Sequence, residues 1–176
     1  TAGHCTDGAT GGRVWFESDM QQPGLGYPFG GPTSVEFCGI ATHPQFHEGS
    51  FVLHDVGVVT LCEPVEMDTY GVLPAVNQLD QLKTKRGTQD VTFTAVGYGL
   101  QQSFPDAASW KEHNVKIRMV ATPKLNQINV PGFTGDFSLL LSNNANTGGT
   151  CFGDSGGPNF LGDTNIVAGV TSFGIN

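Results

Sequence analysis

Basic side chains are scarce in this sequence of 176 residues. It has 8 Lys+Arg against 16 Asp+Glu, which gives a formal net charge of −8. Nucleic-acid binding depends mainly on clustered Lys and Arg side chains that neutralise phosphates. Because the few basic residues are scattered through a net-negative chain, the sequence predicts no nucleic-acid partner.

Long hydrophobic runs are also missing. No apolar stretch approaches the roughly 18 to 20 residues that cross a bilayer, and the first residues do not resemble a secretory leader. The sequence therefore predicts no membrane association. With 38% hydrophobic residues, 14% charged residues and 25 glycines, the composition is typical of a globular chain rather than a disordered one.

Cysteine is limited to four residues, and none of them forms the paired C-x-x-C spacing of a zinc site or a redox motif: Cys5, Cys38, Cys62 and Cys151. Well-separated cysteines in a Gly-rich chain favour disulfides in an oxidising compartment over metal ligation. We therefore expect a secreted, extracellular protein without a metal.

The apolar stretches that are present are short, rich in Val, Phe, Thr and Ile, and separated by turn residues. They predict strands over residues 35–40, 56–61, 91–96, 115–120, 137–141 and 166–170. Several short strands spaced by turns indicate an all-β sandwich or barrel. The one helical candidate, residues 75–85, lies in a polar stretch that reads as a linker, so we expect two β units, residues 1–82 and 83–176.

A glycine-rich serine motif carries the most specific chemical signal: Gly153-Asp154-Ser155-Gly156-Gly157-Pro158. One interpretation is a tight glycine turn in which Asp154 accepts backbone N–H bonds. The other is catalytic: the bend exposes the Ser155 hydroxyl and directs the Gly153 and Ser155 N–H groups at one point, where an oxyanion could be held. A serine needs a base to become a nucleophile.

Two further residues could complete such a site. His4 lies in Thr1-Ala2-Gly3-His4-Cys5 and can serve as the base, although a lone histidine is more often a structural residue. Asp55 precedes an apolar strand, where it can cap a turn or, if shielded from water, accept the Nδ1 proton of an imidazole. The sequence thus predicts a His4, Asp55, Ser155 triad.

Together these motifs resemble the trypsin and chymotrypsin-like serine endopeptidases, over nearly the whole chain. The resemblance implies two six-stranded antiparallel Greek-key β-barrels, incomplete at both ends here. It makes His4 the general base and acid, Asp55 its orienter, Ser155 the nucleophile, and the Gly153 and Ser155 amides the oxyanion hole. It also implies protein or peptide substrates and protein inhibitors as partners, and no cofactor.

The resemblance extends to specificity. It places Gly149 at the bottom of the primary specificity pocket, followed by Thr150, and makes Ser172, Phe173 and Gly174 the segment that binds substrate backbone. A pocket base without charge cannot offset the desolvation of a cationic side chain. We therefore expect an apolar or aromatic residue, rather than Arg or Lys, before the cleaved bond.

The cysteines allow three pairings within the chain. If residues 44–54 are the loop of an antiparallel hairpin, Cys38 and Cys62 lie on facing strands and can form a disulfide. The resemblance implies that Cys5 and Cys151 pair with cysteines outside this chain, which would leave both unpaired here.

Two other functions compete with the endopeptidase. An α/β-hydrolase esterase also uses G-x-S-x-G, but it needs a histidine after the serine and strands that alternate with helices, and this sequence has neither. A non-catalytic serine-protease homologue that acts as a binding protein is the second alternative. Labelling of Ser155 by an organophosphate or sulfonyl fluoride would separate it from the enzyme.

Overall fold

A computed structural model describes residues 1–50, 52–83, 90–102 and 113–174, and its regular structure is almost entirely strand. The elements in chain order are α1 (Gly3–Thr6), β1 (Arg13–Val14), β2 (Val35–Thr42), the 3₁₀ helix η1 (Glu48–Ser50), β3 (Gly57–Leu61), the 3₁₀ helix η2 (Leu79–Leu82), β4 (Phe93–Gly97), β5 (Met119–Ala121), β6 (Leu125–Val130), β7 (Gly135–Leu141), β8 (Pro158–Leu161) and β9 (Val167–Val170). The expected all-β class is confirmed. Within these described ranges, no helix has the length and apolar character that crossing a bilayer requires.

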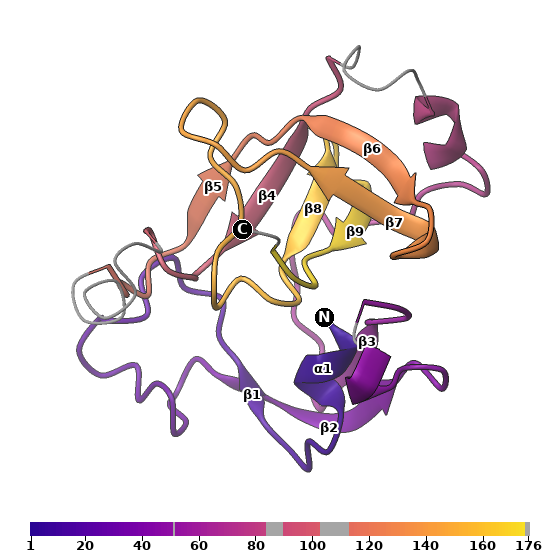
Figure 1. The fold of residues 1–176 in the computed structure, drawn as a ribbon. Coiled ribbons are helices and arrows are strands. Elements are labelled where there is room, and N and C mark those ends of the chain that lie inside the picture. The colour runs from indigo at the N-terminus through magenta and orange to yellow at the C-terminus, as the bar shows by residue number, and fades with distance from the viewer. Residues whose placement is uncertain (51, 84–89, 103–112, 175–176) are drawn as a thin grey trace.

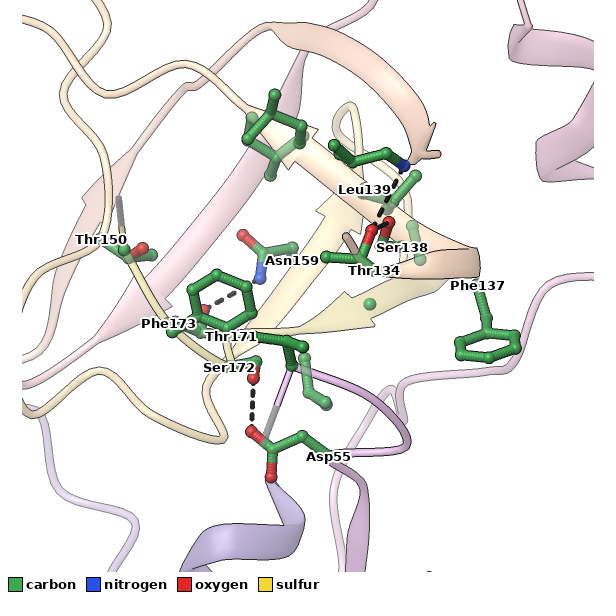
Figure 2. A pocket seen from close by; sticks show the side chains of 18 of the residues that line it. Asp55, Thr134, Phe137, Ser138, Leu139, Thr150, Asn159, Thr171, Ser172 and Phe173 are labelled. Carbon is green, nitrogen blue, oxygen red and sulfur yellow. Dashed lines mark hydrogen bonds between the residues drawn. The ribbon is translucent and has the colours of Figure 1, made fainter. Parts of the chain in front are cut away.

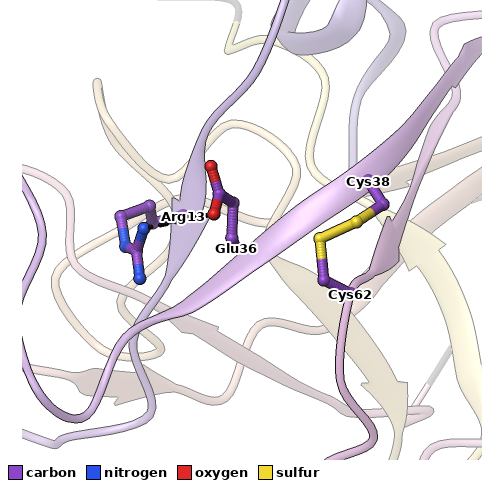
Figure 3. Close-up of a disulfide and its surroundings, with 4 residues drawn as sticks. All are labelled: Arg13, Glu36, Cys38 and Cys62. Carbon is purple, nitrogen blue, oxygen red and sulfur yellow. Dashed lines mark ion pairs between the residues drawn. A yellow bond between two sulfur atoms is a disulfide. The ribbon is translucent and has the colours of Figure 1, made fainter.

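The first sheet has the order β1-β2-β3, with antiparallel neighbours. The long connection after β2 turns the chain back so that Thr42 pairs with Gly57 and Phe37 with Leu61, and the register shifts between Phe37 and Gly39. Cys38 sits at this irregularity and forms a disulfide with Cys62, with their Cα atoms 5.0 Å apart (Figure 3). This is the pair that the hairpin interpretation predicts.

The remaining strands form a four-stranded sheet of order β5-β4-β8-β9 and a two-stranded sheet of β6 and β7. Figure 1 shows these six strands together, apart from β1 to β3, with α1 beside β2 and β3. The core includes Phe93 and Ala95 on β4 and Leu125 on β6, which are almost fully buried. The described sheets are antiparallel but do not close into barrels.

The connection between the two groups already bonds to the second one near its start. Val72 forms an isolated bridge with Ile166, and the Asn165 side-chain amide donates to the Tyr70 carbonyl. In the stretch expected to be helical, the described residues form only η2. The division of the chain at residue 82 stays a prediction.

One predicted strand differs from the structure. The expected strand over residues 115–120 begins only at Met119, because the residues before it bond elsewhere: the Arg118 amide donates to Ser18, and Ile117 bridges Asp19. Met119, an apolar residue of this stretch, is 46% exposed. Strand β5 lies at the edge of its sheet, where an apolar side chain has fewer neighbours to cover it.

Candidate active site

The segment that carries His4 packs directly on the loop that carries Asp55. Ala2 and Gly3 are buried, and a Cβ on Gly3 would lie 3.0 Å from the Val56 nitrogen and 3.1 Å from Asp55 Oδ1. The Gly57 amide donates to the Thr1 carbonyl across 2.9 Å. Glycine at position 3 therefore lets α1 approach the start of β3 closely.

His4 makes two hydrogen bonds to the Asp55 carboxylate. Its backbone amide donates to Oδ1 at 2.7 Å, and its ring Nδ1 lies 2.8 Å from Oδ2. Because an ionised carboxylate only accepts, the neutral imidazole carries its proton on Nδ1 and presents Nε2 as an acceptor. The Asp55 side chain is 3% exposed, whereas that of His4 is 34% exposed, so the ring remains accessible to a reacting group.

The Asp55 carboxylate also accepts a hydrogen bond from the Ser172 hydroxyl (Figure 2). Burial raises the pKa of Asp55. The hydrogen bonds from Ser172 and from the His4 amide and ring, together with the charge of His4, outweigh burial and hold this pKa below its usual range. Asp55 is therefore ionised at neutral pH, where it can stabilise an imidazolium.

Ser155 lies on an exposed turn built by glycines and Asp154. Gly153 and Gly156 have φ values of +94° and +78°, in the region that favours glycine. The Asp154 carboxylate accepts from the Gly99 amide at 2.7 Å and from the Cys151 amide at 2.8 Å, which anchors the turn. This is the turn-forming role of the first interpretation, and Ser155 is exposed on the same turn.

The turn packs against the His4 segment. A Cβ on Gly156 would lie 2.2 Å from Thr1 Oγ1 and 2.8 Å from the Ala2 nitrogen, and Cys5 Sγ lies 3.9 Å from the Ser155 carbonyl oxygen. Among the described contacts, no hydrogen bond joins the His4 ring to the Ser155 hydroxyl. Catalytic hydrogen bonds are often long without substrate and tighten in the complex.

The two amides expected to form the oxyanion hole are available. The Asp154, Gly156 and Gly157 amides all donate to backbone carbonyls. In the part of the chain that the structure describes, the Gly153 and Ser155 amides donate to no protein acceptor. Two free N–H groups on either side of Asp154 are thus left for a ligand oxygen.

A cavity of about 680 Å³ lies beside this turn and is lined by Asp55, Thr150, Ser172, Phe173 and Gly174. Gly149 is not in its lining, because the Asn143 amide covers the space where a side chain would begin: a Cβ on Gly149 would lie 2.4 Å from Asn143 Oδ1. The expected pocket residues thus gather around one cavity, apart from Gly149.

One contact and two residues of this site were not predicted from the sequence. Ser172 donates a hydrogen bond to Asp55, and Asn159 lines the cavity. The His54 ring stacks on the His43 ring, with centroids 4.8 Å apart, and lies tilted against the Phe137 ring, with centroids 4.6 Å apart. His54 has a φ of +56°, in the left-handed region. An isolated histidine beside an aspartate carries no signal for this conformation.

The other cysteines and the potential metal ligands add no further group. Cys5 and Cys151 are both free thiols. Over residues 1–50, 52–83, 90–102 and 113–174, no three or more His, Cys, Asp or Glu side chains are arranged to hold a metal ion.

Comparisons with known proteins identify the family and a similar fold. The family model described as Trypsin matches residues 1–176. No curated protein sequence matches, whereas 35 chains of solved structures do. One is an HL collagenase at 1.7 Å resolution, with a TM-score of 0.72 and 22% identity, over 99% of this chain and 69% of that chain. At this identity, the likeness concerns the fold.

Proposed function

The chain belongs to the trypsin family of serine endopeptidases, and from this premise we propose that His4, Asp55 and Ser155 are its catalytic triad. The observation that carries the proposal is the pair of hydrogen bonds between His4 and Asp55. They orient the imidazole with Nε2 free of a protein partner among the described residues. The residues around His4 in the sequence, Thr1, Ala2 and Cys5, contact the Ser155 turn. In this proposal, three residues that are far apart in the sequence act at one accessible surface.

The reaction follows from these positions. The Ser155 Oγ attacks the carbonyl carbon of the scissile bond while its proton passes to His4 Nε2, and the resulting oxyanion accepts from the Gly153 and Ser155 amides. The tetrahedral species collapses to an acyl-enzyme as His4 returns the proton to the leaving amine. Water then attacks the ester with His4 again as the base, and release of the acid restores Ser155.

Asp55 remains ionised through both steps. Its carboxylate fixes the His4 tautomer and stabilises the imidazolium that forms each time the ring takes a proton. Ser172 supports this role because its hydroxyl also donates to the carboxylate. No metal or organic cofactor has a step in this reaction.

For specificity, we propose an apolar or aromatic side chain, rather than Arg or Lys, before the cleaved bond. Of the described residues that line the cavity, Asp55 is the only carboxylate, and its oxygens already accept from His4 and Ser172. A cationic guest would therefore lose its hydration without gaining a free counter-charge. The covalent Cys38–Cys62 bond supports a further part of the proposal, secretion into an oxidising compartment.

Labelling by phenylmethanesulfonyl fluoride tests the function. We expect one sulfonyl group per chain on Ser155, found by mass spectrometry of peptides, together with loss of peptide cleavage. Ser155→Ala should abolish both, whereas Ser18→Ala, which alters an exposed serine elsewhere, should change neither. A folded protein that is never labelled and cleaves no peptide would contradict the proposal and favour the non-catalytic binding homologue.

A further inference from the structure

Asn159 is a buried amide in the wall of the cavity beside the Ser155 turn. It lies on β8, is 6% exposed, and pairs in register with Ala95 on β4 and Gly169 on β9. Both neighbours are small, so the asparagine side chain has room to face the cavity, where it is one of the lining residues. A polar side chain at such a position needs a reason.

Only one end of this amide has a partner. Nδ2 donates to Thr171 Oγ1 at 3.0 Å, while Oδ1 has no hydrogen-bond partner among the described residues and no contact with solvent. Figure 2 shows the oxygen pointing away from Thr171. A buried acceptor without a donor is unfavourable, so a donor that reaches Oδ1 would remove this cost. Asn159 Oδ1 can therefore accept a hydrogen bond from a ligand.

Strand pairing links Asn159 to the Ser155 turn. The Gly156 amide donates to the Thr171 carbonyl at 2.7 Å, and the Thr171 amide donates to the Gly157 carbonyl at 2.9 Å. Asn159 is four positions after Ser155 in the sequence, so their Cα atoms are at most about 14 Å apart. A long side chain whose carbonyl is held at Ser155 can extend along this path into the cavity.

We propose that Asn159 Oδ1 is a specificity determinant that accepts a hydrogen bond from the substrate side chain before the cleaved bond. This inference rests on the proposed function and narrows its substrate class. The enzyme should prefer an uncharged side chain that ends in a donor, Tyr over Phe and Gln over Met. The cavity's apolar lining contacts the apolar part of the side chain, and Asn159 Oδ1 accepts a hydrogen bond from the donor at its end.

The residues that line the cavity disfavour substrate side chains that carry a charge. A single neutral oxygen cannot replace the hydration of an ammonium or guanidinium group. A carboxylate would bring a second acceptor against Oδ1, with no Lys or Arg among the described lining residues. An uncharged donor is the remaining complement.

Matched peptides that differ only in that residue test the inference on the wild-type chain. We expect kcat/KM for Tyr to exceed that for Phe, and for Gln to exceed that for Met, by about tenfold. Asn159→Leu should abolish the preference for Tyr over Phe and for Gln over Met. Asn114→Leu is the matched control, because Asn114 Oδ1 is also buried and unpaired but lies outside the cavity lining.

Asn159→Asp gives a second test if the leucine variant does not fold. The new carboxylate should raise cleavage after Lys about tenfold or more while the Tyr preference is retained. Tyr and Phe cleaved equally by wild type, a Tyr preference that survives Asn159→Leu, or a preference for Glu would overturn the inference and leave the endopeptidase intact. Absence of all cleavage and of Ser155 labelling would overturn both.

Discussion

At the scale of single residues, Asp55 determines the electrostatics of the site. Its carboxylate accepts from His4, near the start of the chain, and from Ser172, near its end. Burial alone would raise the pKa of Asp55, but these donors favour the ionised form more strongly. The same bonds that orient the imidazole therefore also stabilise the folded chain whenever Asp55 is charged.

This coupling predicts how stability depends on pH. Because the folded pKa of Asp55 lies below its unfolded value of about 4, the folded state gains stability above that pH and loses it as pH falls through the folded pKa. Urea unfolding of Ser155→Ala, chosen to avoid self-cleavage, should show a steeper loss of unfolding free energy below pH 5 than the Ser155→Ala/Asp55→Asn double variant.

The matched control is Asp163→Asn in the same background, which alters an exposed aspartate between β8 and β9. It should retain the acid dependence of the parent. Parallel curves for the parent and the Asp55→Asn variant would mean that the bonds to His4 and Ser172 do not stabilise the charged carboxylate.

At the scale of elements, several of the strands could be predicted from a hydrophobic run in the sequence. The expected strands at residues 35–40, 137–141 and 166–170 correspond to β2, β7 and β9. The sequence did not predict β6, because Asn126, Gln127 and Asn129 interrupt its apolar pattern. Strand β6 forms through pairing with β7, which a local pattern does not contain.

The site shows the same division. The residues of the proposed triad and oxyanion hole could be singled out in the sequence because each lies in a short motif with its own chemistry. Asn159 and His54 could not, because their roles depend on which cavity a strand faces and on a left-handed backbone conformation. Gly149 was expected in the pocket from its place before Ser155, yet the Asn143 side chain covers it.

The Cys38–Cys62 disulfide predicts a stability effect within the first sheet. It closes a sequence separation of 24 residues across β2 and β3, which corresponds to about 3 kcal/mol of unfolding free energy. Urea unfolding of Ser155→Ala with both cysteines changed to serine should show a loss of this size. Cys5→Ser, which alters an exposed free thiol, should stay within about 0.5 kcal/mol. A loss below about 1 kcal/mol in the double variant would mean that β2 and β3 pair equally well without the bond.

At the scale of the whole molecule, the site exists only where the two groups of strands meet. His4 and Asp55 come from the group with β1 to β3, and Ser155 and Ser172 from the group with β4 to β9 (Figure 1). Gly156 is a point of close contact between them, because its Cα faces Thr1 and the Ala2 nitrogen. Its missing side chain sets how near the Ser155 turn can come to the His4 segment.

Gly156→Ala should therefore separate the two halves of the proposed triad. A Cβ there would lie 2.2 Å from Thr1 Oγ1 and 2.8 Å from backbone, so the His4 segment or the Ser155 turn must move. A displacement of about 1 Å is expected to lower kcat/KM about 100-fold.

Gly162→Ala is the control: it also places alanine at a positive φ, +54°, but in open space. Both variants should lose about 1 to 2 kcal/mol of stability from the left-handed conformation, and only Gly156→Ala should lose activity. Equal activity in the two variants would show that the reach of His4 to Ser155 does not depend on this contact.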